Sequence, residues 1–173
     1  IAFDYSVAEV IAMGWVHGER GGGRARRRAL ASVMAVAQVT GLADRIFATL
    51  SSGEQQRVQF ARGLLQLHGA DRTETHRWLL LDEPTANLDI AHGIALLEAL
   101  RELAADDLGV LVVLHDLNLA ARFADRILLL VDGRNARSGR PEDVLDGHLL
   151  SSAYGTRVHV EHNTTLDRLV VLT

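Results

Sequence analysis

Hydrophobic residues in the first third of the chain recur every three to four positions, which is the period of an amphipathic helix. Ser6 and Glu9 have capping-box spacing and predict a short helix from about residue 10 to 13, ended by Gly14. Helices are also expected at 24–38, with Leu30, Val33, Met34 and Ala37 inward, at 43–47, and at 54–67, with Val58, Ala61, Leu64 and Leu65 inward. Glycine-rich residues 17–23 are expected to form a loop. Residues 1–67 are therefore predicted to be helical.

The pattern then changes to short, almost continuously apolar runs at 77–81, 110–114 and 126–131. Such runs are typical of strands buried on both faces of a parallel sheet. Helices are expected between them at 90–103, with Asp89 as N-cap and Ile94, Leu97, Leu100 and Leu103 on one stripe, and at 117–124. This alternation predicts an α/β architecture in residues 68–173.

The end of the chain carries turn signals. Asp132-Gly133 predicts a hairpin after the third apolar run, and Pro141 starts a short helix to about residue 145. Residues 149–154 fit another helix, and residues 157–162 and 168–172 alternate as two strands around a polar turn. A small β hairpin is therefore expected at the C-terminus.

Composition narrows the class of protein. A chain of 173 residues with 48% hydrophobic content can bury one ordinary core, and its formal charge of −4 argues against a nucleic-acid partner. There is no cysteine, so disulfides and thiolate metal sites are excluded. The sequence opens at Ile1 without a signal-peptide pattern, and we expect it to be an internal fragment of a longer protein.

Two adjacent carboxylates follow the first apolar run. Asp82 and Glu83 would project from the C-terminal edge of a parallel sheet, where open α/β folds bind ligands. Asp82 suits a Mg²⁺ contact, direct or through water, and Glu83 can orient and deprotonate an attacking water. The alternative is that Asp-Glu-Pro only ends a strand and forms a turn.

A second candidate is the turn Leu50-Ser51-Ser52-Gly53-Glu54 at the start of a helix. The first N–H groups of a helix and its dipole attract anions, and Ser51 adds a hydroxyl. An ordinary N-cap beside a glycine is the alternative. The order of turn, basic helix, apolar strand, Asp-Glu, second strand and His115 favours a phosphate site. His115 alone could be a core residue.

These segments together resemble the motifs of ATP-binding cassette (ABC) ATPases. Residues 50–58 resemble the signature motif, and 79–85 resemble the Walker B segment. Residues 86–89 fall where the family has its D-loop, and His115 falls at the switch histidine. The resemblance covers essentially the whole chain and implies a partial P-loop NTPase fold of the α/β class. It divides the chain into a helical signature subdomain at 1–67 and the C-terminal part of the RecA-like core at 68–173.

The resemblance also implies roles for individual residues. The signature residues Ser51, Ser52, Gly53 and Glu54 would contact ATP held mainly by a second, identical subunit. Asp82 would serve Mg²⁺, and Glu83 would activate water. His115 would hold the γ-phosphate and the water in register, while Asp89 would sense the opposite subunit.

Three residues depart from the usual motifs. Ser52 replaces a glycine and would be strained if the position required a positive φ. Glu54 replaces a glutamine and puts another carboxylate near the phosphates, and Ala86 stands where serine is more typical. The chain also lacks a Gly-x-x-x-x-Gly-Lys-Ser/Thr phosphate loop, and residue 1 aligns just after the family's Q-loop. We therefore predict that this chain alone neither binds ATP tightly nor hydrolyses it.

Residues 116–120 and 124–126 resemble the ATPases of iron-siderophore, haem and vitamin B12 importers, and 54–59 with 77–82 favour the haemin group. This implies an ATPase on the cytoplasmic face of the bacterial inner membrane, with permease subunits as partners and a substrate-binding protein acting indirectly. Siderophore or cobalamin import is the alternative substrate assignment. A soluble ABC ATPase acting on ribosomes or nucleic acid, and a non-catalytic truncated remnant, are alternatives of other classes.

Overall fold

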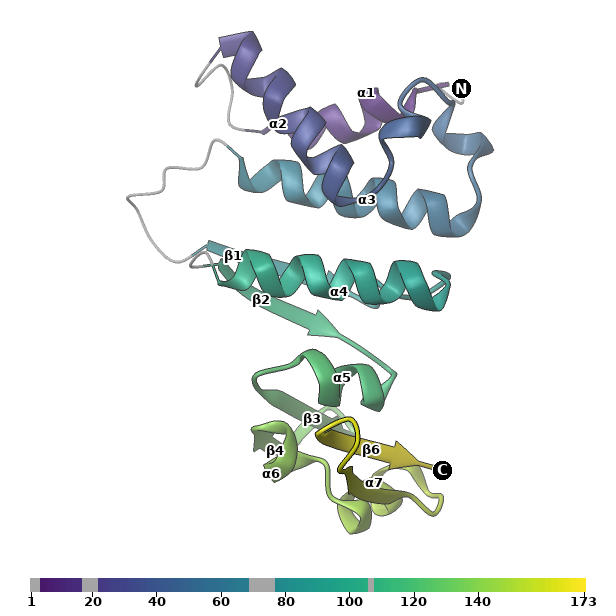
Figure 1. Cartoon of the computed structure of the whole chain (residues 1–173), viewed down its shortest axis with the longest axis vertical. Coiled ribbons are helices and arrows are strands. Elements are labelled where there is room, and N and C mark those ends of the chain that lie inside the picture. Colours follow the sequence, from purple (N-terminus) through teal and green to yellow (C-terminus); the bar gives the residue numbers. More distant parts are fainter. Residues whose placement is uncertain (1–3, 17–21, 69–76, 106–107) are drawn as a thin grey trace. The chain divides into compact units, whose positions relative to one another are not determined.

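The chain folds into two compact units, residues 1–113 and 114–173. The structure is a computed structural model that describes residues 4–16, 22–68, 77–105 and 108–173. Figure 1 shows the order of the elements along the chain. Most of the predicted loop at 17–23 lies outside the described residues. The boundary between these units differs from the expected boundary between residues 67 and 68. That expected boundary separates the motifs by function, and it stays a prediction.

The first unit begins with three packed helices, α1 (Val7–Ala12), α2 (Gly22–Val36) and α3 (Ser52–Leu67). The predicted capping box at α1 is confirmed, because the Ser6 side chain accepts from Glu9 N while the Glu9 side chain accepts from Ser6 N. The inward face expected for α3 is also confirmed. The buried core residues of these helices are Val7, Val10, Ile11, Ala29, Val33, Met34, Val58, Phe60, Ala61, Leu64 and Leu65.

The predicted helix at 43–47 is wrong. Two short 3-10 turns, η1 (Thr40–Leu42) and η2 (Phe47–Thr49), flank an irregular link instead. Val7 N donates to Arg45 O at 2.9 Å and Ala8 N donates to Ala43 O at 3.0 Å. These carbonyls are therefore paired with the start of α1 and are not available for helical hydrogen bonds.

The parallel strand pair predicted after residue 76 is confirmed. β1 (Arg77–Asp82) pairs in parallel with β2 (Leu108–Val113), and α4 (Ile90–Ala104) packs against β2. The buried stripe of α4 is Gly93, Leu96, Leu97 and Leu100, whereas Ile94 and Leu103 are only half-buried. The predicted stripe was therefore shifted around the helix.

The prediction that these strands are buried on both faces is wrong for the described residues. Leu79 is 7% exposed, but its neighbours Trp78 and Leu80 are 61% and 67% exposed, and Leu111 and Val113 are exposed as well. Successive side chains of a strand point to opposite faces. One face of the β1–β2 pair is therefore buried and the other is open.

The second unit contains α5 (Leu117–Phe123), β3 (Ile127–Val131), β4 (Arg134–Gly139), α6 (Pro141–Val144), α7 (Gly147–Tyr154), β5 (His159–Asn163) and β6 (Arg168–Leu172). β3 forms the predicted hairpin with β4, so it lies in an antiparallel pair and not in a parallel sheet with β1 and β2. Asp132 and Gly133 both have positive φ at the turn, as a tight hairpin requires. The C-terminal β5–β6 hairpin is confirmed.

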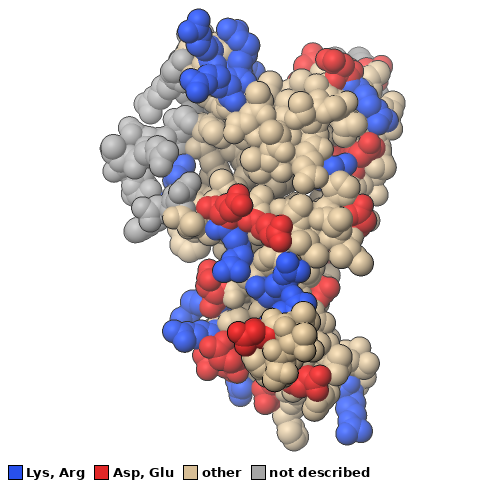
Figure 2. Space-filling view, viewed as in Figure 1, with Lys and Arg blue, Asp and Glu red and all other residues tan. Residues whose placement is uncertain are grey.

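The second unit has its own hydrophobic core. Leu129, Val144, Leu145, Leu150, Val158 and Val171 are its buried members. None of the described helices is both long and apolar enough to cross a membrane. Figure 2 shows arginine side chains gathered over the first turns of α2, where Arg24, Arg26, Arg27 and Arg28 are exposed.

Candidate functional site

The predicted anion-binding turn is built by the N-terminus of α3. Ser51 is its N-cap, and Ser51 Oγ accepts a hydrogen bond from Glu54 N at 3.3 Å. In return, Ser51 N and Ser51 Oγ donate to Glu54 Oε2 at 2.8 and 2.9 Å. Ser51 and Ser52 are exposed. The turn is thus a closed capping box that presents the first amides of a sixteen-residue helix toward solvent.

The Glu54 carboxylate has a second partner outside the helix. Arg45 Nη1 lies 3.2 Å from Glu54 Oε1. Hydrogen bonds from the Ser51 backbone and side chain lower the pKa of Glu54 below its ordinary value, and the charges of Arg45 and Arg57 add to the effect. Glu54, which replaces the usual glutamine of the signature, is therefore kept ionised, and its negative charge is balanced by Arg45.

The signature turn touches the D-loop segment through a glycine. A Cβ at Gly53 would lie 2.7 Å from Asn87 O, a distance that no ordinary side chain tolerates. Asn87 itself has a φ of 63°, in the left-handed region. Gly53 therefore permits a close approach between two segments separated by strand β1.

Glu83 occupies a strained backbone position just after β1. Its φ is 45°, and for a residue other than glycine this region costs about 1–2 kcal/mol. Three hydrogen bonds hold its peptide groups: Glu83 N donates to Val113 O at 3.1 Å, while Glu83 O accepts from Ala86 N at 3.0 Å and from Gln56 Nε2 at 3.5 Å. Backbone strain of this kind clusters at functional sites, which supports a chemical role for this residue.

Asp82 ends β1 opposite Val113, the last residue of β2, and its side chain is exposed. Within the described residues, no group of three or more His, Asp or Glu side chains could hold a metal ion. Mg²⁺ keeps several waters and is commonly bound by one or two carboxylates together with substrate phosphates. Asp82 therefore fits a Mg²⁺ whose other ligands are water and phosphate oxygens.

Asp89 caps the helix that follows the D-loop segment. Asp89 Oδ1 accepts from His92 N at 2.9 Å, and His92 Nδ1 lies 2.8 Å from Asp89 Oδ2. The His92 backbone N–H, followed by its side chain, lowers the pKa of Asp89. The carboxylate expected to face a second subunit is thus oriented by α4 itself.

His115 belongs to the second compact unit, where it is exposed and directly precedes the N-cap Asp116. Asp116 Oδ1 accepts from Asn118 N at 2.8 Å and from Leu119 N at 3.1 Å. The backbone around the expected switch histidine is therefore fixed by the start of α5.

The structure brings the signature turn, the end of β1 and the D-loop segment together in one compact unit. The strain considered for Ser52 does not arise, because Ser52 is the first residue of α3 and is not among the described residues with positive φ. Sequence reasoning missed Arg45 and His92, and it placed Asn87 in the D-loop segment without its close approach to Gly53. The Ser51–Glu54 pair could have been found, because its spacing is the same as that of Ser6 and Glu9.

Comparison with known proteins gives a consistent family. No protein-family model matches the chain. Three relatives are each named hemin import ATP-binding protein HmuV, and they come from Jannaschia sp. strain CCS1, Deinococcus radiodurans and Bordetella parapertussis. They are 41%, 45% and 43% identical over 99%, 96% and 99% of this chain. The chain spans 63%, 63% and 66% of their respective lengths.

Solved structures agree with this likeness. A metal-chelate type ABC transporter in an inward-facing conformation shares the fold with a TM-score of 0.81 at 23% identity, over 99% of this chain and 68% of that chain. A dimeric bacterial ABC transporter cassette matches with a TM-score of 0.68 at 30% identity, over 79% of this chain and 57% of that one. By the arrangement of its signature, Walker B and D-loop segments and by these likenesses, the chain is similar to the ATP-binding subunits of ATP-binding cassette transporters.

Proposed function

We propose that the gene product containing this chain is the ATP-hydrolysing subunit of an ABC importer and that it powers the uptake of haemin. The observation that carries the proposal is the contact between Gly53 and Asn87, which joins the signature turn to the segment after Asp82-Glu83. Relatives named as hemin import ATP-binding proteins support the importer class and the substrate. Iron-siderophore or cobalamin import is the alternative, because residues 116–120 and 124–126 resemble that wider group of importers.

The proposed residue roles are those that the resemblance implies, and the positions described above support them. Glu83 orients and deprotonates the attacking water, and Asp82 contributes an oxygen ligand to Mg²⁺, which supplies charge neutralisation to the phosphates when bound. Ser52 and Gly53 offer amide donors, and Ser52 a hydroxyl, to the γ-phosphate of ATP on a second copy, while Glu54 supports this turn. Ser51 joins them when its hydroxyl turns from Glu54 Oε2 to the phosphate.

The remaining proposed roles concern the arrangement of subunits. His115 holds the γ-phosphate and the water in register, and Asp89 meets the opposite subunit. The helical segment 1–67 and the core segment 68–173 serve as separate functional parts of each subunit.

The proposed assembly is a homodimer of this subunit on permease subunits at the cytoplasmic face of the inner membrane. A substrate-binding protein delivers haemin to the permease from the other side. A dimeric cassette among the similar structures, and another bound to ADP and phosphate, support the pairing and the nucleotide. Nucleic acid is not an expected partner.

The test is ATP hydrolysis by the purified complete gene product, measured as phosphate release. Glu83→Gln is expected to lower the rate by about 100-fold or more, because it removes the base while keeping the side-chain shape. Glu102→Gln, an exposed change on α4, is the matched control and is expected to retain activity. Equal activity of both variants, or no hydrolysis by the unmodified protein, would overturn the ATPase assignment.

The substrate is tested with the permease reconstituted in vesicles. Haemin uptake should require ATP and the binding protein, and it should be lost in Glu83→Gln. Uptake of a ferric siderophore or cobalamin with no uptake of haemin would replace the substrate while leaving the ATPase assignment intact.

A further inference from the structure

Arg45 is anchored at both its backbone and its side chain. Its carbonyl accepts a hydrogen bond from Val7 N at 2.9 Å, which ties it to the first turn of α1. Its guanidinium Nη1 donates to Glu54 Oε1 at 3.2 Å. Arg45 thus connects the start of α1 to the first turn of α3.

The two carboxylate oxygens of Glu54 have different hydrogen-bond partners. Oε2 accepts from both the amide and the hydroxyl of Ser51, whereas Oε1 faces Arg45. A carboxylate that is bound from two sides has little rotational freedom about its terminal bond. The orientation of the Ser51 hydroxyl therefore depends on Glu54, and that of Glu54 depends on Arg45.

The negative charge on Glu54 has to be neutralised near a phosphate site, whereas a neutral glutamine at this position would need no such partner. A carboxylate one helical turn from the donors of a phosphate site repels the incoming anion. The Arg45 side chain is 48% exposed and that of Glu54 is 23% exposed, so the pair adds little to folding stability. The Arg45–Glu54 ion pair instead neutralises the carboxylate and fixes its orientation.

We propose that Arg45 is a positioning residue of the signature turn, acting through Glu54 to hold the capped start of α3, whose Ser52 and Gly53 amides receive the nucleotide phosphate. The proposal rests on the function proposed above and adds a residue outside the family-like motifs. It explains how the chain carries an acidic residue at position 54 while keeping the turn suited to an anion.

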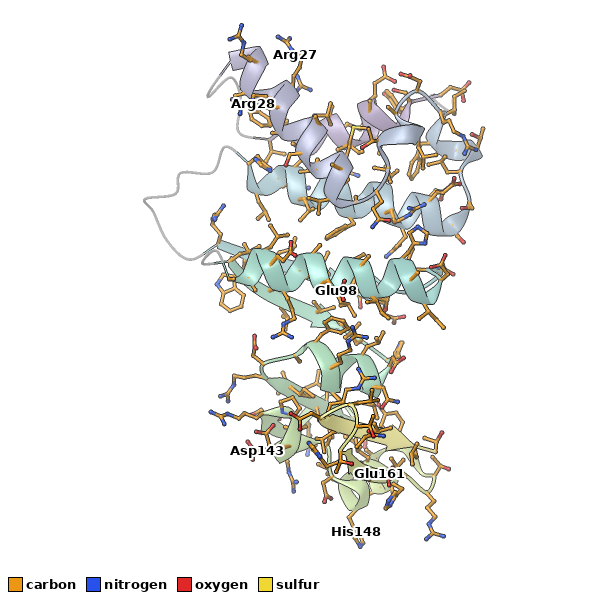
Figure 3. The ribbon with its side chains drawn as sticks, viewed as in Figure 1. Arg27, Arg28, Glu98, Asp143, His148 and Glu161 are labelled. Atoms are coloured by element: carbon orange, nitrogen blue, oxygen red, sulfur yellow. The ribbon has the colours of Figure 1, made fainter. Side chains whose placement is uncertain are left out.

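The first experiment measures KM for ATP and kcat of the complete gene product. Arg45→Gln is expected to raise KM roughly 3- to 10-fold and to change kcat less than about 2-fold, because phosphate attraction falls while Asp82 and Glu83 are untouched. Arg45→Lys keeps the charge and should stay within about 2-fold of the unmodified KM. Arg28→Gln, at an exposed arginine that projects from α2 in Figure 3, removes the same charge and is the matched control.

The second arm asks whether Arg45 acts through Glu54. In a Glu54→Gln background the carboxylate charge is absent, so adding Arg45→Gln should change KM less than about 2-fold. A KM effect of full size in that background, or an Arg45→Gln variant that behaves like Arg28→Gln, would overturn the proposal. Loss of hydrolysis in Glu83→Gln in the same series keeps the ATPase assignment standing in either case.

A third measurement does not depend on activity. The Ser51 amide donates to Glu54 Oε2, so its hydrogen exchange, followed by NMR, reports the orientation of the carboxylate. Arg45→Gln should speed exchange at Ser51 by about 3-fold or more, while the equivalent Ser6 amide, bonded to Glu9 Oε2, stays unchanged. Unchanged exchange at Ser51 would refute the positioning role even if the protein proved not to be an ATPase.

Discussion

Asn118 and Val171 exchange two hydrogen bonds between the first turn of α5 and strand β6. Asn118 Nδ2 donates to Val171 O at 3.0 Å, and Val171 N donates to Asn118 Oδ1 at 2.8 Å. The side-chain amide thus pairs with the strand as a neighbouring backbone would. Because α5 starts two residues after His115, this pair fixes the C-terminal hairpin to the helix that follows the expected switch histidine.

The Asn118 pair should be a measurable source of stability. Asn118→Ala leaves the N–H and C=O of Val171, a residue only 7% exposed, without these partners, and it should lower the free energy of unfolding by about 1–2 kcal/mol. Urea denaturation followed by circular dichroism measures the loss. Asn135→Ala on exposed strand β4 is the control and should cost less than about 0.5 kcal/mol. Equal losses in the two variants would show that the pair contributes nothing specific.

Two glycines of α3 should respond oppositely to alanine. Gly53→Ala places a Cβ 2.7 Å from Asn87 O and must displace the D-loop segment, whereas Gly63→Ala meets nothing within 4 Å. Alanine in a helix interior is favoured over glycine by about 0.5–1 kcal/mol, so Gly63→Ala should raise stability and Gly53→Ala should lower it. Thermal unfolding of both variants gives the comparison. A stabilised Gly53→Ala variant would mean that the close approach is not maintained.

Local signals in the sequence predicted the elements well. Ser6, Asp89 and Pro141 marked helix starts, and Asp132-Gly133 marked the β3–β4 turn, because caps and tight turns depend on a few adjacent residues. The inward stripe of α4 was less predictable. Gly93 is buried, and a Cβ added to it would lie 3.8 Å from Thr85 Cβ. A hydrophobicity pattern does not mark a glycine as a contact point.

The sequence predicted the motifs of the site, but it did not predict the contacts between the segments that carry them. Arg45 contacts Glu54 from the irregular link between η1 and η2. Asn87 approaches Gly53 although strand β1 lies between them in the sequence. Neither contact follows a helical or strand period, so no spacing rule points to it. The same holds for Asn118 and Val171, which are 53 positions apart.

The Glu54 capping box should make part of the stability depend on pH. Hydrogen bonds from Ser51 lower the pKa of Glu54 below its ordinary value of 4.5, so the folded state favours the ionised carboxylate. Its contribution is fully present above pH 4.5 and is lost as pH falls through the lowered pKa. Glu54→Gln should therefore lose less stability than the unmodified chain between pH 7 and about pH 3, as measured by urea denaturation at each pH.

Glu9 provides an internal comparison for the pH effect. Its pKa is lowered by the same kind of hydrogen bonds, here from Ser6, and Glu9→Gln should reduce the pH dependence in the same direction. A Glu54→Gln variant with the full acid sensitivity of the unmodified chain would contradict the assignment.

Trp78 and Gly109 form a cross-strand pair whose disturbance should be visible by fluorescence. They are opposite each other in the β1–β2 register, and a Cβ at Gly109 would lie 2.5 Å from Trp78 Cε3. Gly109→Ala must move the indole, and because Trp78 is already 61% exposed the ring can turn outward at a cost below about 1 kcal/mol. The chain has two tryptophans, so a Trp15→Phe background isolates the emission of Trp78. The emission maximum should shift to the red in Gly109→Ala and stay unchanged in Gly41→Ala, where an added Cβ meets nothing within 4 Å. If both variants kept the same spectrum, the indole would not cover Gly109 in solution.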